Sequence, residues 1–162
     1  MFRIIIILSL SLILLIGCSR KDNIELSSDA SNEEIATAAY KEAVTALNKG
    51  DAFYAGKKFR EVESLLPQSE WATKSSLMAA YSDYSRNSYA ESIFALERHI
   101  KNYPADKNIP YAHYLIAICY YEQILDEKKD LRPLVKSKIK FESIINEFPD
   151  TDYAIDARYK LD

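Results

Sequence analysis

Three prolines divide most of this chain into units of similar length, and this regularity constrains the fold more than any other feature. Pro67, Pro104 and Pro149 each follow an amphipathic segment. Each is followed within a few residues by an aromatic residue and an alanine: Trp71-Ala72, Tyr111-Ala112 and Tyr153-Ala154. Proline does not continue a helix, and a recurring unit of this size indicates stacked supersecondary structures.

The segments between these breaks have the pattern of helices. Apolar residues recur there at three- and four-residue spacing, which is the period of an amphipathic helix. Turn-forming residues fill the stretches 48–51, 66–69, 86–88, 103–106 and 148–151. The expected N-caps are Asp51, Ser69, Asn108 and either Asp150 or Thr151. The sequence therefore predicts an all-α chain with two helices in each unit.

The spacing within each unit resembles that of the 34-residue tetratricopeptide repeat. Before Pro67, the turn, small and aromatic positions hold Gly50, Ala55 and Phe59. The same region before Pro104 holds Tyr89, Ser92 and Leu96. We expect a right-handed α-solenoid over residues 34–162, with hairpins at about 34–68, 69–106 and 108–149 and the start of a fourth at 150–162. The polar stretch 126–132 is predicted to be a loop insertion.

Stacked hairpins leave a concave side that is lined by the first helix of each pair. Small residues should let the helices approach closely, at Ala43, Ala55, Ala79 and Ala80. The chain has 12 tyrosines, although a helical core needs few hydroxyl groups. Aromatic rings with a polar tip can anchor an extended peptide. The candidate groove residues are Tyr81, Tyr84, Tyr114 and Tyr121, for each of which packing in the core is the competing interpretation.

The N-terminus has the pattern of a bacterial lipoprotein signal. An apolar run over residues 4–16 leads into Gly17 and Cys18. A helix of this length rises only about 20 Å, whereas the hydrocarbon core of a bilayer is about 30 Å thick. We therefore expect residues 1–17 to be a cleaved signal peptide and Cys18 to carry a covalent lipid, the alternative being an uncleaved anchor. The polar residues 18–33 are predicted to be a flexible tether.

Composition argues against several other functions. The formal net charge of −3 disfavours general nucleic-acid binding. Lys57 and Lys58 lie close to Glu61 and Glu63, as on a solvated helix face, and the lysines at 136–140 lie close to Glu142. We expect no nucleic-acid partner.

The sequence also lacks the motifs of a catalytic or metal site. His99 and His113 have no carboxylate or cysteine at ligand spacing, so metal binding is not expected. Cys119 lies in a helical apolar run and is predicted to be buried and unreactive. There is no glycine-rich phosphate loop or nucleophile elbow. We therefore expect a non-enzymatic protein whose only attached group is the lipid on Cys18.

The order of these features resembles the BamD family, the tetratricopeptide lipoproteins of the β-barrel assembly machinery in the bacterial outer membrane. The resemblance rests on the lipoprotein signal, the tether and three later segments: 100–104 (IKNYP), 108–114 (NIPYAHY) and 148–154 (FPDTDYA). It implies a protein anchored at the periplasmic face of the outer membrane. The residue after the cysteine is Ser19 rather than aspartate, which also favours the outer over the inner membrane.

The resemblance further implies which partners the protein has. In the family, N-terminal repeats offer a groove to unfolded outer-membrane β-barrel proteins, and C-terminal repeats dock on BamA within a complex of Bam subunits. Family members carry more repeats than this chain, so we expect the N-terminal portion, with substrate recognition but without the docking repeats. Two alternatives stay open: a periplasmic scaffold of the cell-wall or division machinery, and the accessory solenoid of an enzyme.

Overall fold

The computed structural model describes residues 31–124 and 130–162, so the signal peptide, Cys18 and most of the predicted tether lie outside it. All of the regular secondary structure in the described part is helical, which confirms the all-α prediction. The helices are α2 (Asn32–Asn48), α3 (Ala52–Leu65), α4 (Glu70–Ser85), α5 (Tyr89–Asn102), α6 (Ile109–Tyr121), α7 (Arg132–Glu147) and α8 (Asp152–Leu161). None of these helices has both the length and the apolarity that a membrane span requires.

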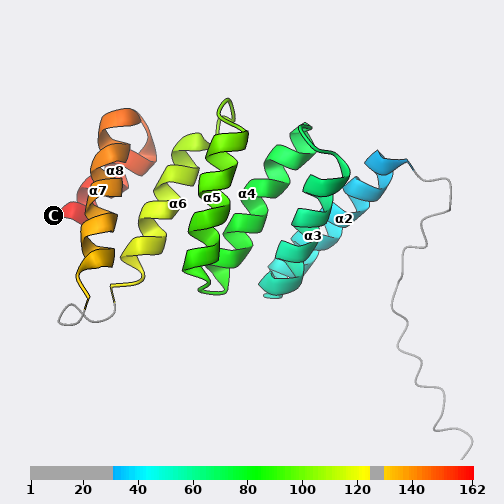
Figure 1. Cartoon of the computed structure of the whole chain (residues 1–162), viewed down its shortest axis with the longest axis horizontal. Helices are drawn as coiled ribbons and strands as arrows, with labels where there is room; N and C mark the ends of the chain where they lie inside the picture. Colours follow the sequence, from blue (N-terminus) through cyan, green and yellow to red (C-terminus); the bar gives the residue numbers. More distant parts are fainter. Residues whose placement is uncertain (1–30, 125–129) are drawn as a thin grey trace, which may run out of the picture.

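The helices form a single row of antiparallel hairpins, as Figure 1 shows. We number the pairs α2–α3, α4–α5 and α6–α7 as hairpins one, two and three, and α8 follows them. First helices approach each other at two of the three joints, where α2 contacts α4 and α6 contacts α8. No contact of that extent joins α4 to α6, α3 to α5 or α5 to α7 in the described residues. The first helices therefore form the inner side of a tetratricopeptide-like solenoid.

Three of the predicted N-caps are confirmed. The side chains of Asp51, Ser69 and Thr151 accept hydrogen bonds from backbone N–H groups of the following helix, at 3.0, 3.0 and 3.3 Å. Asn108 occupies the predicted cap position of α6, but its side chain makes no capping hydrogen bond. Its side chain donates to Asp106 instead. The backbone of Asn108 explains this, because its ψ of 9° is not the extended conformation that Ser69 and Thr151 have at their cap positions.

Two predicted boundaries differ from those of the structure. α2 begins at Asn32, within the last residues assigned to the tether. Ser31 and Glu34 form a capping box there, in which each side chain accepts from the backbone N–H of the other residue. α7 begins at Arg132, the last residue of the predicted loop insertion, while residues 125–129 lie outside the description. In both places the residues are polar, so the apolar periodicity that indicates a helix begins only after the helix itself has begun.

The core lies between the helices in successive clusters rather than at one centre. Ala43, Ala55 and Ala79 surround Phe59 where hairpin one meets α4. Ala80 belongs to a larger cluster that extends from α4 to α8. Small side chains were therefore predicted correctly at these close approaches. Gly56 marks another close approach between helices, since a Cβ atom there would lie 3.3 Å from Cβ of Ser82 on α4.

Cys119 is fully buried in this larger cluster, as expected from its apolar surroundings. Its Sγ lies 3.5 Å from Oγ of Ser92 on α5. Burial raises the pKa of the Cys119 thiol to about 11. The thiolate, which is the reactive form, is therefore scarce at neutral pH.

Candidate functional site

The four tyrosines predicted to line the groove fall into two pairs. Tyr81 and Tyr84 are half-buried on α4, with ring centroids 6.1 Å apart. Tyr114 and Tyr121 lie on α6 and both pack against Phe141 of α7, at centroid distances of 6.4 and 6.1 Å. Tyr121 is the most open of the four, with 41% of its surface exposed. The structure thus gives these residues partial packing roles and leaves part of each ring accessible.

Tyr114 has the most restrained hydroxyl group of the four. It donates to the carboxylate of Asp156 on α8, and its ring lies 5.2 Å from that of Tyr153. Burial, followed by this hydrogen bond, raises the pKa of Tyr114. The nearby hydroxyl groups of Tyr84 and Tyr111 raise it further. Tyr114 therefore stays a neutral hydrogen-bonding group at physiological pH.

Tyr111 and Tyr153 belong to the same group, although the sequence analysis used them only as markers of the repeat. Their rings are 5.7 Å apart and join α6 to α8. Burial raises the pKa of Tyr111, and the hydroxyl groups of Tyr81, Tyr153 and Tyr84 add to the effect. We call Tyr81, Tyr84, Tyr111, Tyr114 and Tyr153 the tyrosine cluster. It places phenol groups from three first helices close together, and the aromatic-alanine pairs after Pro104 and Pro149 were the signal for its two additional members.

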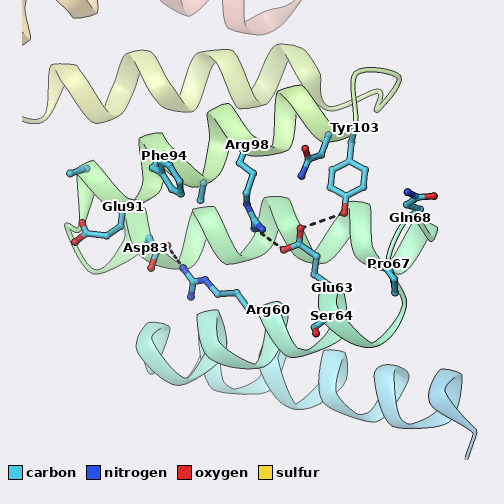
Figure 2. Close-up of a pocket in the computed structure, with 13 residues that line it drawn as sticks. Arg60, Glu63, Ser64, Pro67, Gln68, Asp83, Glu91, Phe94, Arg98 and Tyr103 are labelled. Atoms are coloured by element: carbon cyan, nitrogen blue, oxygen red, sulfur yellow. Dashed lines mark hydrogen bonds and ion pairs between the residues drawn. The ribbon is translucent and has the colours of Figure 1, made fainter.

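A second feature, on the side of the second helices, was not predicted. A cleft of about 1040 Å³ lies between α3 and α5, with α4 beneath it. Figure 2 shows its lining, in which Phe94 is 72% exposed at one end and Tyr103 stands at the other. Most of the remaining lining is polar or charged.

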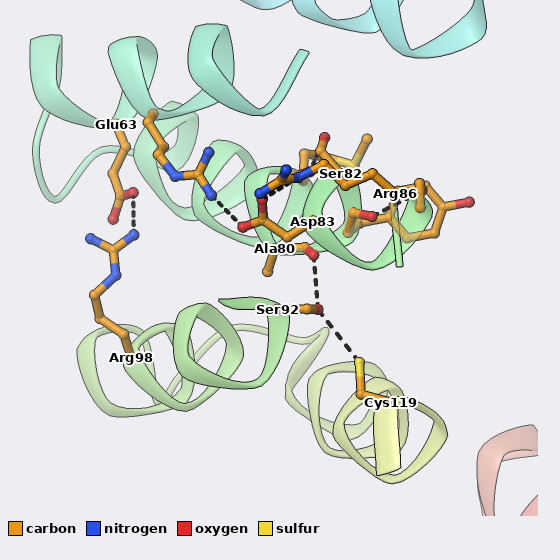
Figure 3. Close-up of polar contacts among 12 residues, drawn as sticks. Glu63, Ala80, Ser82, Asp83, Arg86, Ser92, Arg98 and Cys119 are labelled. Atoms are coloured by element: carbon orange, nitrogen blue, oxygen red, sulfur yellow. Dashed lines mark hydrogen bonds and ion pairs between the residues drawn. The ribbon is translucent and has the colours of Figure 1, made fainter. Parts of the chain in front are cut away.

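Two buried carboxylates organise the charges of this cleft. Glu63 on α3 accepts a hydrogen bond from Nη2 of Arg98 at 2.8 Å and one from the Tyr103 hydroxyl at 3.4 Å. Asp83 on α4 pairs with Arg60 and with Nε of Arg86, the latter at 3.3 Å. Figure 3 shows both groups. The carboxylate side chains are only 12% and 3% exposed, whereas the arginines are partly open to solvent.

The environment of Glu63 differs from the one its neighbours in sequence suggested. Lys58 does pair with Glu61, at 3.0 Å, and with Glu42 on α2, at 3.3 Å, as on a charged helix face. Glu63 instead turns toward hairpin two and binds Arg98 of α5 and Tyr103, directly after α5. The interpretation of Glu63 as part of a solvated face was therefore wrong. Its partners lie too far along the chain for helical spacing to reveal them.

His99 is fully buried next to this cleft, and its ring lies 5.4 Å from that of Tyr103, which lines the cleft. Burial lowers the pKa of His99, although Asp106, whose Oδ2 lies 3.2 Å from its Nε2, and Glu63 oppose the effect. Arg98 lowers the pKa further. The folded state consequently holds His99 neutral at pH values where the unfolded chain protonates it.

We expect this difference to make stability depend on pH. The contribution of His99 should be complete above the ordinary pKa of 6.5 and should fall as the pH is lowered toward the depressed folded-state value. Urea unfolding of the wild type and of His99→Gln, at about pH 7.5 and about pH 5.5, measures the change. The variant should lose less stability on acidification. An identical loss in both proteins would show that other groups, such as the half-buried His113, dominate.

Comparison with known proteins places these features in a family. A family model described as "YfiO: Outer membrane lipoprotein" matches residues 32–162. A relative named outer membrane protein assembly factor BamD, from Caulobacter vibrioides, is 40% identical over 123 residues, which are 76% of this chain and 40% of the relative.

Two further relatives carry the same name. The protein from Rickettsia prowazekii is 34% identical over 148 residues, covering 90% of this chain and 56% of the relative. The protein from Neisseria meningitidis serogroup A is 25% identical over 171 residues, covering 99% and 64%. The chain thus spans roughly half the length of the curated relatives it matches.

Proposed function

The chain belongs to the YfiO family of outer membrane lipoproteins, whose named relatives are BamD assembly factors, and from this premise we propose that it takes part in assembling outer-membrane proteins. Its role in this proposal is to bind polypeptides, without catalysis. The partners are unfolded outer-membrane β-barrel proteins, BamA and other Bam subunits. The protein acts from the periplasmic face of the outer membrane, through a lipid on Cys18 after cleavage of the Gly17–Cys18 bond.

The tyrosine cluster is the observation that supports polypeptide binding most directly. Three successive first helices, α4, α6 and α8, contribute rings to it, so it extends across neighbouring hairpins. A half-buried phenol offers an apolar ring to a guest side chain and a hydroxyl group to a guest backbone. Such rings lose little conformational entropy on binding, because neighbouring residues already hold them. Tyr121, on the same helix as Tyr111 and Tyr114, lies beyond the cluster and packs against Phe141 of α7.

Site-specific photo-crosslinking tests this proposal. A photoreactive residue is placed at Tyr81, Tyr121 or the outward-facing Lys57, and unfolded β-barrel peptides are added to the full chain. We expect stronger labelling at the two tyrosine positions, because both belong to first helices, whose side of the solenoid is proposed to bind the guest. Circular dichroism melts of each variant control for damage to the fold, chiefly at the half-buried Tyr81. Labelling no stronger than at Lys57 would show that the inner side is not the binding surface.

A further inference from the structure

The joint between hairpins one and two is held differently on its two sides. On the inner side α2 and α4 contact each other directly. On the outer side the cleft separates α3 from α5. Arg98 of α5 and Tyr103, the residue directly after that helix, both reach Glu63 of α3 across it (Figure 2). α3 also packs along α4, more extensively than any other two helices of the described residues. This contact acts as the pivot, and the side chains around Glu63 determine how far apart α3 and α5 stand.

The geometry at Glu63 suits it to fix an angle. Its two carboxylate oxygens accept from different residues: Oε2 from Arg98 on α5 and Oε1 from Tyr103, directly after α5. One contact within α5 and one at its C-terminal end restrain both the separation and the rotation of that helix. The carboxylate is largely shielded from water. Attraction between opposite charges is stronger in such a site than on an open surface. Arg60 and Asp83 tie α3 to α4 nearby, so α3 has a fixed base.

This arrangement is specific to one joint and is not a property of every repeat. Glu63 stands four residues before Pro67, and the matching position before Pro104 is Ile100. Arg98 and Tyr103 stand six residues and one residue before Pro104, and the matching positions before Pro149 are Ser143 and Phe148. The next joint thus has neither the carboxylate nor the guanidinium group at these positions. The ion pair is therefore a feature of this joint and is not needed to form the repeat itself.

We propose that Glu63 is a positioning residue which, with Arg98 and Tyr103, forms a strut that sets the angle between hairpins one and two. Each hairpin of a solenoid touches only its neighbours, so a change at one joint moves everything on one side of it. Without the strut, α3 and α5 separate about the contact between α3 and α4, and the inner groove narrows. The effect on guest binding rests on the proposed function, but the effect on the joint angle does not.

The joint angle is measured as a distance between spin labels on the outer side. Labels attached through non-cysteine chemistry replace Lys57 on α3 and Lys101 on α5 in the full chain, and pulsed electron paramagnetic resonance gives their separation. We expect Glu63→Ala to lengthen the mean distance by about 2 Å or more, or to broaden its distribution clearly. Glu61→Ala is the matched control, because Glu61 lies on the same helix but pairs within hairpin one. It should leave the distance unchanged.

A second variant removes the strut from the other end. Arg98→Ala should reproduce the shift of Glu63→Ala, and the double variant should add nothing, since both remove one interaction. Arg98 is partly exposed, so this variant also serves if Glu63→Ala fails to fold. An unchanged distance in the folded single variants, or additive shifts in the double variant, would overturn the proposal. If the distance shifted but guest crosslinking did not change, the strut would be confirmed and its proposed effect on guest binding would be wrong.

Discussion

Replacing Phe59 by alanine is expected to lower the free energy of unfolding by about 3–5 kcal/mol. Phe59 is 0% exposed, and its ring meets that of Tyr40 edge-on at 5.4 Å. Its other neighbours include Ala43, Ala55 and Ala79. These short side chains are fixed to helix backbones and cannot extend into the vacated space, so most of the cavity should remain. Urea unfolding followed by circular dichroism measures the loss.

Phe53 provides a matched control on the same helix. Its side chain is 70% exposed, so Phe53→Ala removes an equal number of atoms without leaving a cavity. We expect its effect to stay within about 0.5 kcal/mol. Equal losses in the two variants would contradict the packing described for hairpin one. Hydrogen exchange should also show the Phe59 effect mainly in α2–α4, since each hairpin depends on its neighbours.

Replacing Cys18 by serine is expected to move the protein from the membrane fraction to the soluble fraction. Each acyl methylene buried in a bilayer contributes about 0.8 kcal/mol, and stable anchoring needs two such chains or an equivalent second signal. A serine hydroxyl is a far weaker nucleophile than a thiol and should not receive the lipid. Fractionation of cells and metabolic labelling with a radioactive fatty acid measure both consequences.

The other cysteine supplies the control for this experiment. Cys119→Ser makes the same chemical change inside the folded domain, next to Ser92, and should leave attachment and labelling intact. If Cys18→Ser stayed with the membrane and kept its label, the proposed lipid anchor would be wrong. The proposal for guest binding would then need a different means of keeping the domain at the membrane.

The helices and turns were predictable because their determinants lie within a few residues of each other. Pro67, Pro104 and Pro149 follow helix ends, and Ser69 and Thr151 cap the helices that begin after two of them. A cap needs an acceptor side chain, a backbone that directs it at the helix, and a free N–H two or three residues later. Asn108 is the exception, because its backbone is not extended and its side chain donates to Asp106.

The candidate site was predictable only in part. The choice of Tyr81, Tyr84, Tyr114 and Tyr121 followed from their places on first helices, whereas the closeness of Tyr111 and Tyr153 to them depends on how neighbouring hairpins meet. The periodic pattern shows which face of a helix is buried. It does not show which aromatic rings from different helices touch.

The amino-acid sequence by itself determined the helical class, the hairpin repeat, most helix ends and the small residues at close approaches, since propensity, capping and periodicity act over one or two turns. Only the tertiary structure decided that Glu63 binds Arg98 and Tyr103, which are 35 and 40 residues away, and that a cleft separates α3 from α5. Those features depend on the angle between packed hairpins. That angle results from the combined shapes of many buried side chains and has no short-range signature in the chain.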